Sequence, residues 1–212
     1  MTMQLGTFGA WFSPVYDDAA RTAFVVEAEA LGYTTAWLGL GARAMATYLD
    51  TLEAGGVPQD RRVLAALGPR ALQLAGERAA GTHPYLVVPD YTRHARAILG
   101  AAPLLAPEHK AVVSTDPQTA RAIGRNFVKD PYLNLRNYVN NLLRHGFTAA
   151  DVADGGSDRL IDALVLHGTP EHIRAGLAAH LDAGANHVGI QVLVAPGEDP
   201  MPGYRALARV LH

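Results

Sequence analysis

Residues 61–88, RRVLAALGPRALQLAGERAAGTHPYLVV, decide the fold class of this chain. Residues 63–67 form a short apolar run of strand length, and Gly68-Pro69 ends it because proline suits the first position of a helix. Residues 70–80 are rich in the helix-favouring Ala and Leu, and residues 85–88 have the composition of a second strand. A helix that connects two parallel strands is the unit of α/β proteins, so this stretch predicts that class.

The composition limits the classes of protein to which the chain can belong. With 212 residues, 49% apolar and 18% charged, it is expected to be globular, and residues 1–212 are expected to form a single domain. The net charge of −2 argues against nucleic acid as a partner. No apolar run reaches membrane-spanning length and no secretory leader pattern is present, so a cytoplasmic location is expected. The absence of cysteine excludes disulfides and thiolate metal ligands.

Strand-like and helix-like segments alternate along the whole chain. The six expected strands cover residues 5–12, 34–40, 63–67, 85–88, 110–115 and 188–194. The expected helices cover residues 17–31, 42–54, 70–80, 89–99, 118–146, 148–153, 158–166, 169–184 and 203–211, with an interruption at Pro131. Asp116 and Thr169 are expected to cap the helices that follow them. The alternation predicts a parallel sheet with helices outside it and a helical excursion at about residues 118–168.

Four stretches of the sequence carry a resemblance to a known family. They are LGTFGAWF (residues 5–12) with EALGYTTAWLG (29–39), the stretch 61–87 quoted above, NYVNNLLRHGF (137–147) with GGSDRLIDALV (155–165), and HLDAGANHVGIQVL (180–193). On these residues the chain resembles the luciferase-like monooxygenase superfamily, in particular the branch that uses the deazaflavin coenzyme F420. The resemblance implies a (β/α) TIM-barrel-like fold and an oxidoreductase that takes F420, with FMN as the alternative cofactor.

The chain is shorter than the eight-stranded barrels that the resemblance implies, which have about 250 residues or more. Compared with them, strands three and four and their helices are missing at residues 38–41, where the family carries part of its flavin platform. We therefore expect an incomplete barrel with about six parallel strands, either as a tighter ring or as an open sheet. An open sheet has two bare edges that can pair with another chain, so a homo-oligomer is expected.

Gly68, Pro69 and Arg70 are the first candidate site, for the phosphate of the cofactor. Glycine lets a phosphate approach the backbone, and the start of a helix offers free N–H groups and the positive end of its dipole. Arg70 can add a charged hydrogen bond. The resemblance implies the same role for this position. The alternative interpretation is an ordinary tight turn between a strand and a helix.

Further candidates for cofactor binding lie near the ends of other predicted strands. His83, followed by Pro84, is expected beside the first site and can donate to a phosphate or a ring carbonyl; alternatively it is a core histidine with one satisfied nitrogen. Trp11 ends the first strand and Gln191 lies in the last, and both are expected to line the pocket of the cofactor ring. Core packing is the alternative for Trp11, and a structural role is the alternative for Gln191.

The candidates on the substrate side are Phe12, Asn137 and Asn141. Phe12 is the last residue of the first expected strand, where an aromatic ring can form a wall for the substrate. Asn137 and Asn141 share a helix face with Arg144, and because Asn is a poor helix former, a polar wall is expected there. The alternative is a buried hydrogen-bond network. No catalytic acid or base is identified.

Other chemistries lack their sequence motifs. The nine histidines include no His-Glu-x-x-His run, so no metal site is expected and the histidines are interpreted as surface or capping residues. The motifs of α/β-hydrolases, P-loop NTPases and Rossmann dehydrogenases are absent as well. The sequence therefore predicts hydride transfer between the coenzyme and a small organic substrate. A shortened, non-catalytic barrel that associates with itself, and an unrelated phosphate-binding (β/α) enzyme such as an isomerase, are the alternatives.

Overall fold

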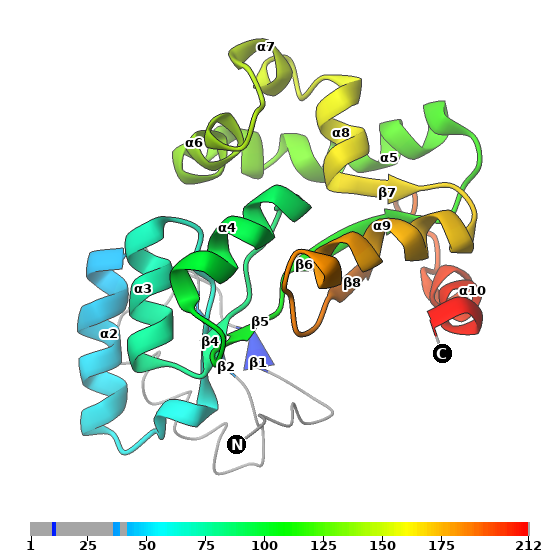
Figure 1. The fold of residues 1–212 in the computed structure, drawn as a ribbon. Coiled ribbons are helices and arrows are strands. Elements are labelled where there is room, and N and C mark those ends of the chain that lie inside the picture. Colours follow the sequence, from blue (N-terminus) through cyan, green and yellow to red (C-terminus); the bar gives the residue numbers. More distant parts are fainter. Residues whose placement is uncertain (1–9, 12–35, 39–41, 212) are drawn as a thin grey trace. The chain divides into compact units, whose positions relative to one another are not determined.

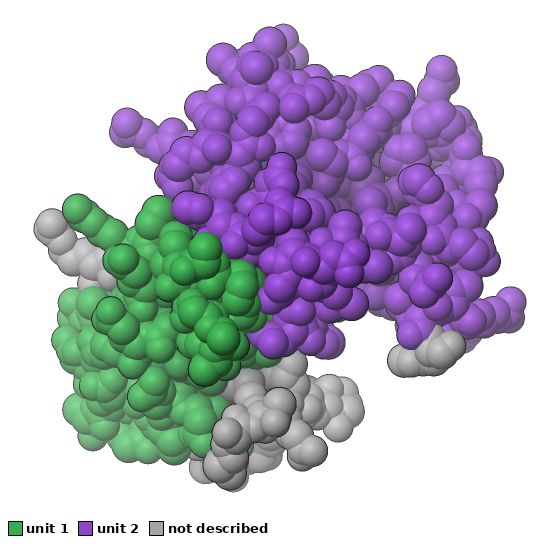
Figure 2. Space-filling model, in the orientation of Figure 1, with its two compact units in different colours: residues 1–84, 95–106 green, residues 85–94, 107–212 purple. Residues whose placement is uncertain are grey.

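The computed structural model describes residues 10–11, 36–38 and 42–211 of the chain. Its contacts divide the chain into two compact units (Figure 2). Unit 1 contains residues 1–84 and 95–106, and unit 2 contains residues 85–94 and 107–212. Phe12, the side chain of Trp11 and the helix expected over residues 17–31 lie outside what the structure describes.

Unit 1 is built on a parallel sheet of five short strands (Figure 1). In sheet order these are β1 (Ala10–Trp11), β2 (Ala36–Leu38), β3 (Arg62–Leu64), β4 (Gly81–Thr82) and β5 (Leu104–Leu105). The helical segments are α2 (Ala42–Ala54), η1 (Gln59–Arg61) and α3 (Pro69–Arg78), with α4 (Pro89–Leu99) divided between the two units. Because α3 connects the parallel strands β3 and β4, the strand–helix–strand unit expected for residues 61–88 is confirmed.

The second strand of that unit lies earlier in the chain than the sequence predicts. The strand expected over residues 85–88 is wrong: the backbone pairs with β3 at Gly81 and Thr82, and residues 85–88 form a loop in which Leu86, Val87 and Val88 are buried. Gly81 explains the position, because a Cβ there would lie 2.0 Å from the backbone oxygen of Leu104. Only a residue without a side chain lets β4 approach β5 so closely, and this long-range requirement outweighs the apolar pattern of the loop.

Unit 2 is built on a second parallel sheet, of three strands in the order β7–β6–β8. The strands are β6 (Glu108–Val112), β7 (Val165–His167) and β8 (Gly189–Val192). The helices that follow β6 are α5 (Pro117–Lys129), η2 (Tyr132–Asn134), α6 (Arg136–Arg144), α7 (Ala149–Val152), α8 (Asp158–Leu164), α9 (Pro170–Asp182) and α10 (Met201–Leu211). β6 is the central strand, and all five of its residues are buried.

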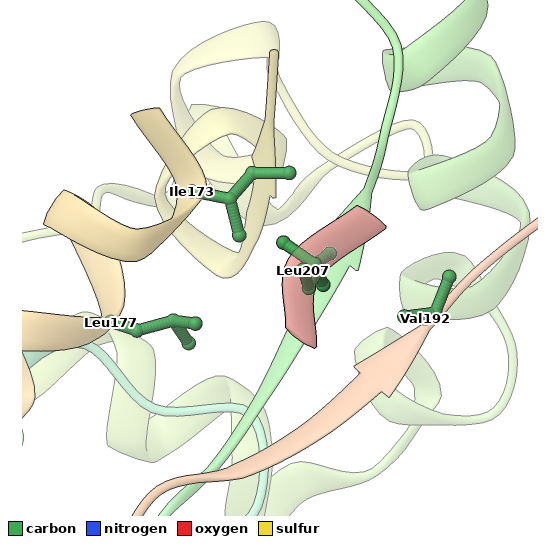
Figure 3. Packing of buried hydrophobic residues seen from close by; sticks show 5 residues of the cluster. Ile173, Leu177, Val192 and Leu207 are labelled. Atoms are coloured by element: carbon green, nitrogen blue, oxygen red, sulfur yellow. The ribbon is translucent and has the colours of Figure 1, made fainter. Parts of the chain in front are cut away.

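The two faces of this second sheet differ in chemistry. On one face, α9 and α10 pack against the sheet around a core of buried apolar side chains, Ala111, Ile173, Leu177, Val192 and Leu207 (Figure 3). Residues directly paired in parallel strands lie on the same face, and side chains alternate between faces along a strand. The opposite face of β6 and β8 therefore carries Glu108, Lys110 and Gln191, the last two of which are register partners.

Local signals placed most of the helices of unit 2 correctly. The Asp116 side chain accepts hydrogen bonds from the backbone N–H groups of Gln118 and Thr119, and Thr169 accepts one from His172, so both expected caps are confirmed. The interruption expected at Pro131 is confirmed too, since α5 ends at Lys129. The helix expected over residues 158–166 is wrong at its end, because Val165–His167 pairs with β6 as strand β7.

The α/β class with parallel strands is confirmed, but the described residues carry eight strands in two sheets. Three strands lie where the sequence indicated none: β4, β5 and β7 have only two or three residues each, too few for a periodic pattern. Among the described residues, no helix is both long enough and apolar enough to span a membrane.

Candidate functional site

The start of α3, at the carboxyl end of β3, is open and uncapped. Gly68 takes an extended conformation (φ −84°, ψ 156°), and no side chain of the described residues caps the first turn of the helix. A Cβ built on Gly68 would meet no atom within 4 Å, so the space beside this residue is free in the described part of the chain. The N–H groups of a first helical turn lack partners within the helix and carry its positive dipole end. This position can therefore bind an anion.

Arg70 lies directly beside this helix start, in the first turn of α3, and is exposed. Its guanidinium has no hydrogen-bond or ion-pair partner within the described ranges. A free guanidinium beside uncapped backbone N–H groups is a suitable donor set for a phosphate. Gly68, Pro69 and Arg70 thus form one continuous candidate for an anionic group.

Thr82 and His83, at the end of β4, hold the neighbouring loops in place. The Thr82 hydroxyl donates to the Leu64 carbonyl at 2.8 Å and accepts from the Ala66 N–H at 3.2 Å, which fixes the segment that leads to Gly68. The His83 backbone N–H also donates to the Leu64 carbonyl, at 2.8 Å. The role of Thr82 follows from the pairing of β3 and β4, which the sequence placed elsewhere.

His83 is buried, and its Nδ1 lies 2.6 Å from the Ala106 carbonyl. A carbonyl can only accept, so Nδ1 carries a proton and donates it. In the neutral ring, Nε2 is then an acceptor, and His83 can donate to a phosphate only when it is protonated. The Nδ1 contact is one that a core histidine makes. Pro84, which follows it, is buried.

The remaining sequence candidates lie in unit 2. Gln191 is half-buried on β8, and the side chain has no hydrogen-bond partner among the residues that the structure describes. On α6, Asn137 is exposed whereas Asn141 is buried, so the two differ in their surroundings although they are one helical turn apart. The Asn141 Oδ1 atom is buried without a hydrogen-bond partner in the described structure.

The structure reveals a buried ion pair that the sequence analysis missed. The Lys110 Nζ atom lies 2.9 and 3.0 Å from the two carboxylate oxygens of Glu108, and both side chains are almost fully buried. The same Nζ lies 5.2 Å from the ring centroid of Tyr85 and 5.3 Å from that of Tyr132. Tyr138 packs edge-on against Tyr132, with 4.9 Å between the centroids. Glu-x-Lys in a strand looks like a solvated face, so no sequence signal pointed to this cluster.

Burial shifts the protonation equilibria of this cluster. It raises the pKa of Glu108, while the Lys110 ammonium and the backbone N–H of Leu86 act in the opposite direction. Burial also raises the pKa of Tyr85 to about 12, and raises the pKa of Tyr132 and Tyr138, with the negative charge of Glu108 adding to each shift. All three phenols are therefore neutral near pH 7 and can donate hydrogen bonds.

A second buried polar group lies on the other face of β6. The Nδ1 atom of His180 lies 2.8 Å from the Thr92 hydroxyl, and its Nε2 lies 3.0 Å from Nδ1 of His109. Burial lowers the pKa of His109 to about 3 and that of His180 to about 4, so both rings are neutral at pH 7. The interpretation of the histidines as surface or capping residues is wrong for these two, which are 3% and 0% exposed. Their burial depends on how α9 packs on β6, which the sequence does not encode locally.

The described residues contain no group of three or more His, Asp or Glu side chains placed to hold a metal ion.

Comparison with known proteins places the fold. No protein-family model matches the chain, and no curated protein matches it at a significant level. Among solved structures, the chain is similar to an F420-dependent secondary alcohol dehydrogenase in complex with an F420-acetone adduct (TM-score 0.57, 10% identity), covering 84% of this chain and 70% of that one. It is also similar to apo-MsnO8 (TM-score 0.62, 15% identity), covering 92% of this chain and 74% of that one. A third similar structure is the EDTA monooxygenase from Chelativorans sp. BNC1 (TM-score 0.50, 14% identity), with 73% of this chain and 45% of that one covered.

At these identities the similarity concerns the fold. The chain shares the fold of the F420-dependent dehydrogenase, of MsnO8 and of the EDTA monooxygenase, as the resemblance to luciferase-like proteins implies. The chain spans 70% of the length of the F420-dependent dehydrogenase and 74% of the length of MsnO8.

Proposed function

We propose that the protein is an oxidoreductase that binds coenzyme F420, with FMN as the alternative, and transfers a hydride to or from a small organic substrate. The observation that carries the proposal is the uncapped start of α3 with Arg70, which has no partner in the described part of the chain, in a fold shared with an F420-dependent dehydrogenase. The residues described there fit an anionic group, because they offer backbone N–H donors and a guanidinium.

The phosphate of the coenzyme would lie against Gly68 and the first turn of α3. The missing side chain of Gly68 lets the phosphate reach the backbone, the helix start supplies N–H donors, and Arg70 adds a charged hydrogen bond. Thr82 would hold the β3–α3 segment in the binding conformation through its two hydrogen bonds. When bound, the coenzyme ring supplies the hydride chemistry, and the protein supplies binding and orientation.

The alternative is a non-catalytic barrel that binds a cofactor weakly or not at all and associates with itself. The observation that favours it is the length of the chain, which spans 70% and 74% of the first two similar structures. The short edge strands of the two sheets would then pair with a second copy. We expect a homo-oligomer under either function, and a small molecule rather than nucleic acid as the ligand.

Fluorescence titration with F420 and, separately, with FMN tests the proposal. The wild-type protein should bind one of them at micromolar concentration, and Arg70→Ala should weaken binding by about 1–3 kcal/mol, the contribution of a charged hydrogen bond. Arg61→Ala is the matched control, because Arg61 is exposed at the opposite end of β3 and should leave affinity unchanged. Binding of neither molecule would support the non-catalytic alternative, and equal affinity in the Arg70 variant would remove the start of α3 from the site.

A further inference from the structure

Strand β8 is an edge strand of the sheet in unit 2 among the described residues. The backbone N–H groups of Gly189 and Leu193 donate to carbonyls of the β6 segment, so these alternate residues of β8 face β6. Ile190 and Val192 lie on the opposite register and direct their N–H and C=O groups away from β6, toward the outer edge. Such a row of backbone groups is a template for pairing with another strand.

The hydroxyl of Tyr204, on α10, occupies this outer edge. It accepts from the Val192 N–H at 3.2 Å and donates to the Ile190 carbonyl at 3.3 Å. One residue of a neighbouring parallel strand would make the same two bonds, because its N–H would donate to Ile190 and its carbonyl would accept from Val192. The Tyr204 hydroxyl, which is both a donor and an acceptor, therefore takes the place of a strand residue.

Close packing of α10 on β8 brings Tyr204 to this position. A Cβ built on Gly203 would lie 2.7 Å from Cγ1 of Val192, so a residue without a side chain is needed for the helix to approach β8 this closely. Further along α10, Leu207 is buried in the same core as Val192 (Figure 3). The packing at Gly203 is independent of the two hydrogen bonds, and both place the first turn of α10 beside Val192.

The loop between β8 and α10 holds the start of the helix in place. The Ala195 N–H donates to the Glu198 carboxylate at 3.2 Å, and the Met201 N–H donates to the Asp199 carboxylate at 3.0 Å. Because these hydrogen bonds lie within the loop and the first turn, they limit how far Tyr204 can move from the edge of β8.

We propose that Tyr204 is an edge seal, which prevents β8 from pairing with the β8 strand of a second copy. A second copy is the partner to exclude, because two identical edges meet antiparallel about a two-fold axis and every chain carries the complementary edge. The homo-oligomer expected for this chain then has to form through a surface other than this edge. The seal lies within unit 2, whereas the start of α3 belongs to unit 1, so the proposal does not depend on F420 or FMN.

Amide hydrogen exchange, followed by NMR on the full chain, tests the contact itself. Tyr204→Phe keeps the ring and removes the hydroxyl, so the Val192 N–H should exchange about fivefold faster, as expected for one lost hydrogen bond. The Leu193 N–H, which donates to the Ala111 carbonyl, is the control in the same spectrum and should keep its rate. Equal exchange of the Val192 N–H in the two proteins would overturn the proposal.

Disulfide trapping tests what the seal excludes. The chain contains no cysteine, so Gln191→Cys introduces a single thiol between Ile190 and Val192. In an antiparallel pair of β8 strands centred on this residue, the two Cα atoms would lie about 4.5 Å apart, which is within the range of a disulfide. Oxidation should give at least about tenfold more covalent dimer for Gln191→Cys/Tyr204→Ala than for Gln191→Cys alone, in proportion to the freed edge.

A second cysteine position and a second variant of Tyr204 complete the design. Arg174→Cys, at an exposed residue of α9, is the matched control, because random collisions should cross-link it equally with and without Tyr204→Ala. Tyr204→Phe, which keeps the ring, should give a smaller increase in dimer at position 191 and serves as the test if Tyr204→Ala does not fold. Equal trapping at position 191 with and without the Tyr204 substitution, in folded chains, would show that Tyr204 does not protect the edge.

Discussion

Acid should destabilise this protein before its carboxylates titrate, because two histidines are buried in neutral form. Burial lowers the pKa of His109 to about 3 and of His180 to about 4, whereas an unfolded histidine has a pKa of about 6.5. Between these values the unfolded chain binds more protons than the folded one. Stability is therefore fully present above pH 6.5 and falls as the pH decreases toward the folded pKa values.

The magnitude follows from the same values. Each pH unit below 6.5 costs about 1.4 kcal/mol for each buried neutral histidine, so lowering the pH from 7 to 5 should reduce the free energy of unfolding by about 4 kcal/mol. Asp151 and Asp162, whose pKa values are lowered by hydrogen bonds and ion pairs, lose their contribution only at about pH 4 and below. Burial also lowers the pKa of His145 and raises that of Glu108, so both can contribute in the interval from pH 5 to pH 6.5, and a variant is needed to isolate His109 and His180.

Urea denaturation at pH 7, 6 and 5 and constant ionic strength measures this slope. The variant His109→Gln/His180→Gln should lose most of the pH dependence, because glutamine does not titrate. His172→Gln, at an exposed residue of α9, should keep the wild-type slope. The reasoning is refuted if the double variant shows the same slope as wild type, or if the wild-type protein becomes more stable between pH 7 and pH 5.

Three further outcomes are expected from single substitutions, each measured by urea denaturation at pH 7. Asp116→Ala should cost about 1 kcal/mol, because it removes both side-chain hydrogen bonds to the first turn of α5; no change would show that the cap is dispensable. Gly81→Ala should cost about 2–3 kcal/mol, because its Cβ would lie 2.0 Å from a backbone oxygen of β5, while Gly68→Ala, in open space, should fold normally. Lys110→Met should cost about 3–5 kcal/mol by leaving Glu108 buried and unpaired, and a loss below about 1 kcal/mol would contradict that account.

Local chemistry in the sequence was sufficient to predict the α/β class and several helix ends. Pro69 at the start of α3, Asp116 before α5 and Thr169 before α9 act through their own backbone or through hydrogen bonds two or three residues away. Such signals do not depend on contacts with distant residues, so they can be recognised in a single sequence.

The features that the sequence did not predict depend on contacts between distant residues. The position of β4 is set by the close approach of Gly81 to Leu104, and the apolar residues 86–88 are buried without forming a strand. The burial of His180 depends on the packing of α9, since its partners Thr92 and His109 come from distant parts of the sequence. The start of α3 could be identified as a candidate because its signal is local. The fluorescence titration tests whether this position binds an anion.

The two faces of β6 bury polar groups in different ways. On one face, His109 is linked through His180 to Thr92 beside an apolar core. That arrangement gives pH-dependent stability, although Nε2 of His109 is buried without a hydrogen-bond partner among the described residues. On the other face, Lys110 is paired with Glu108 beside the rings of Tyr85 and Tyr132. Since breaking a buried ion pair leaves one group unpaired, this face contributes to stability through the pair itself rather than through a titrating histidine.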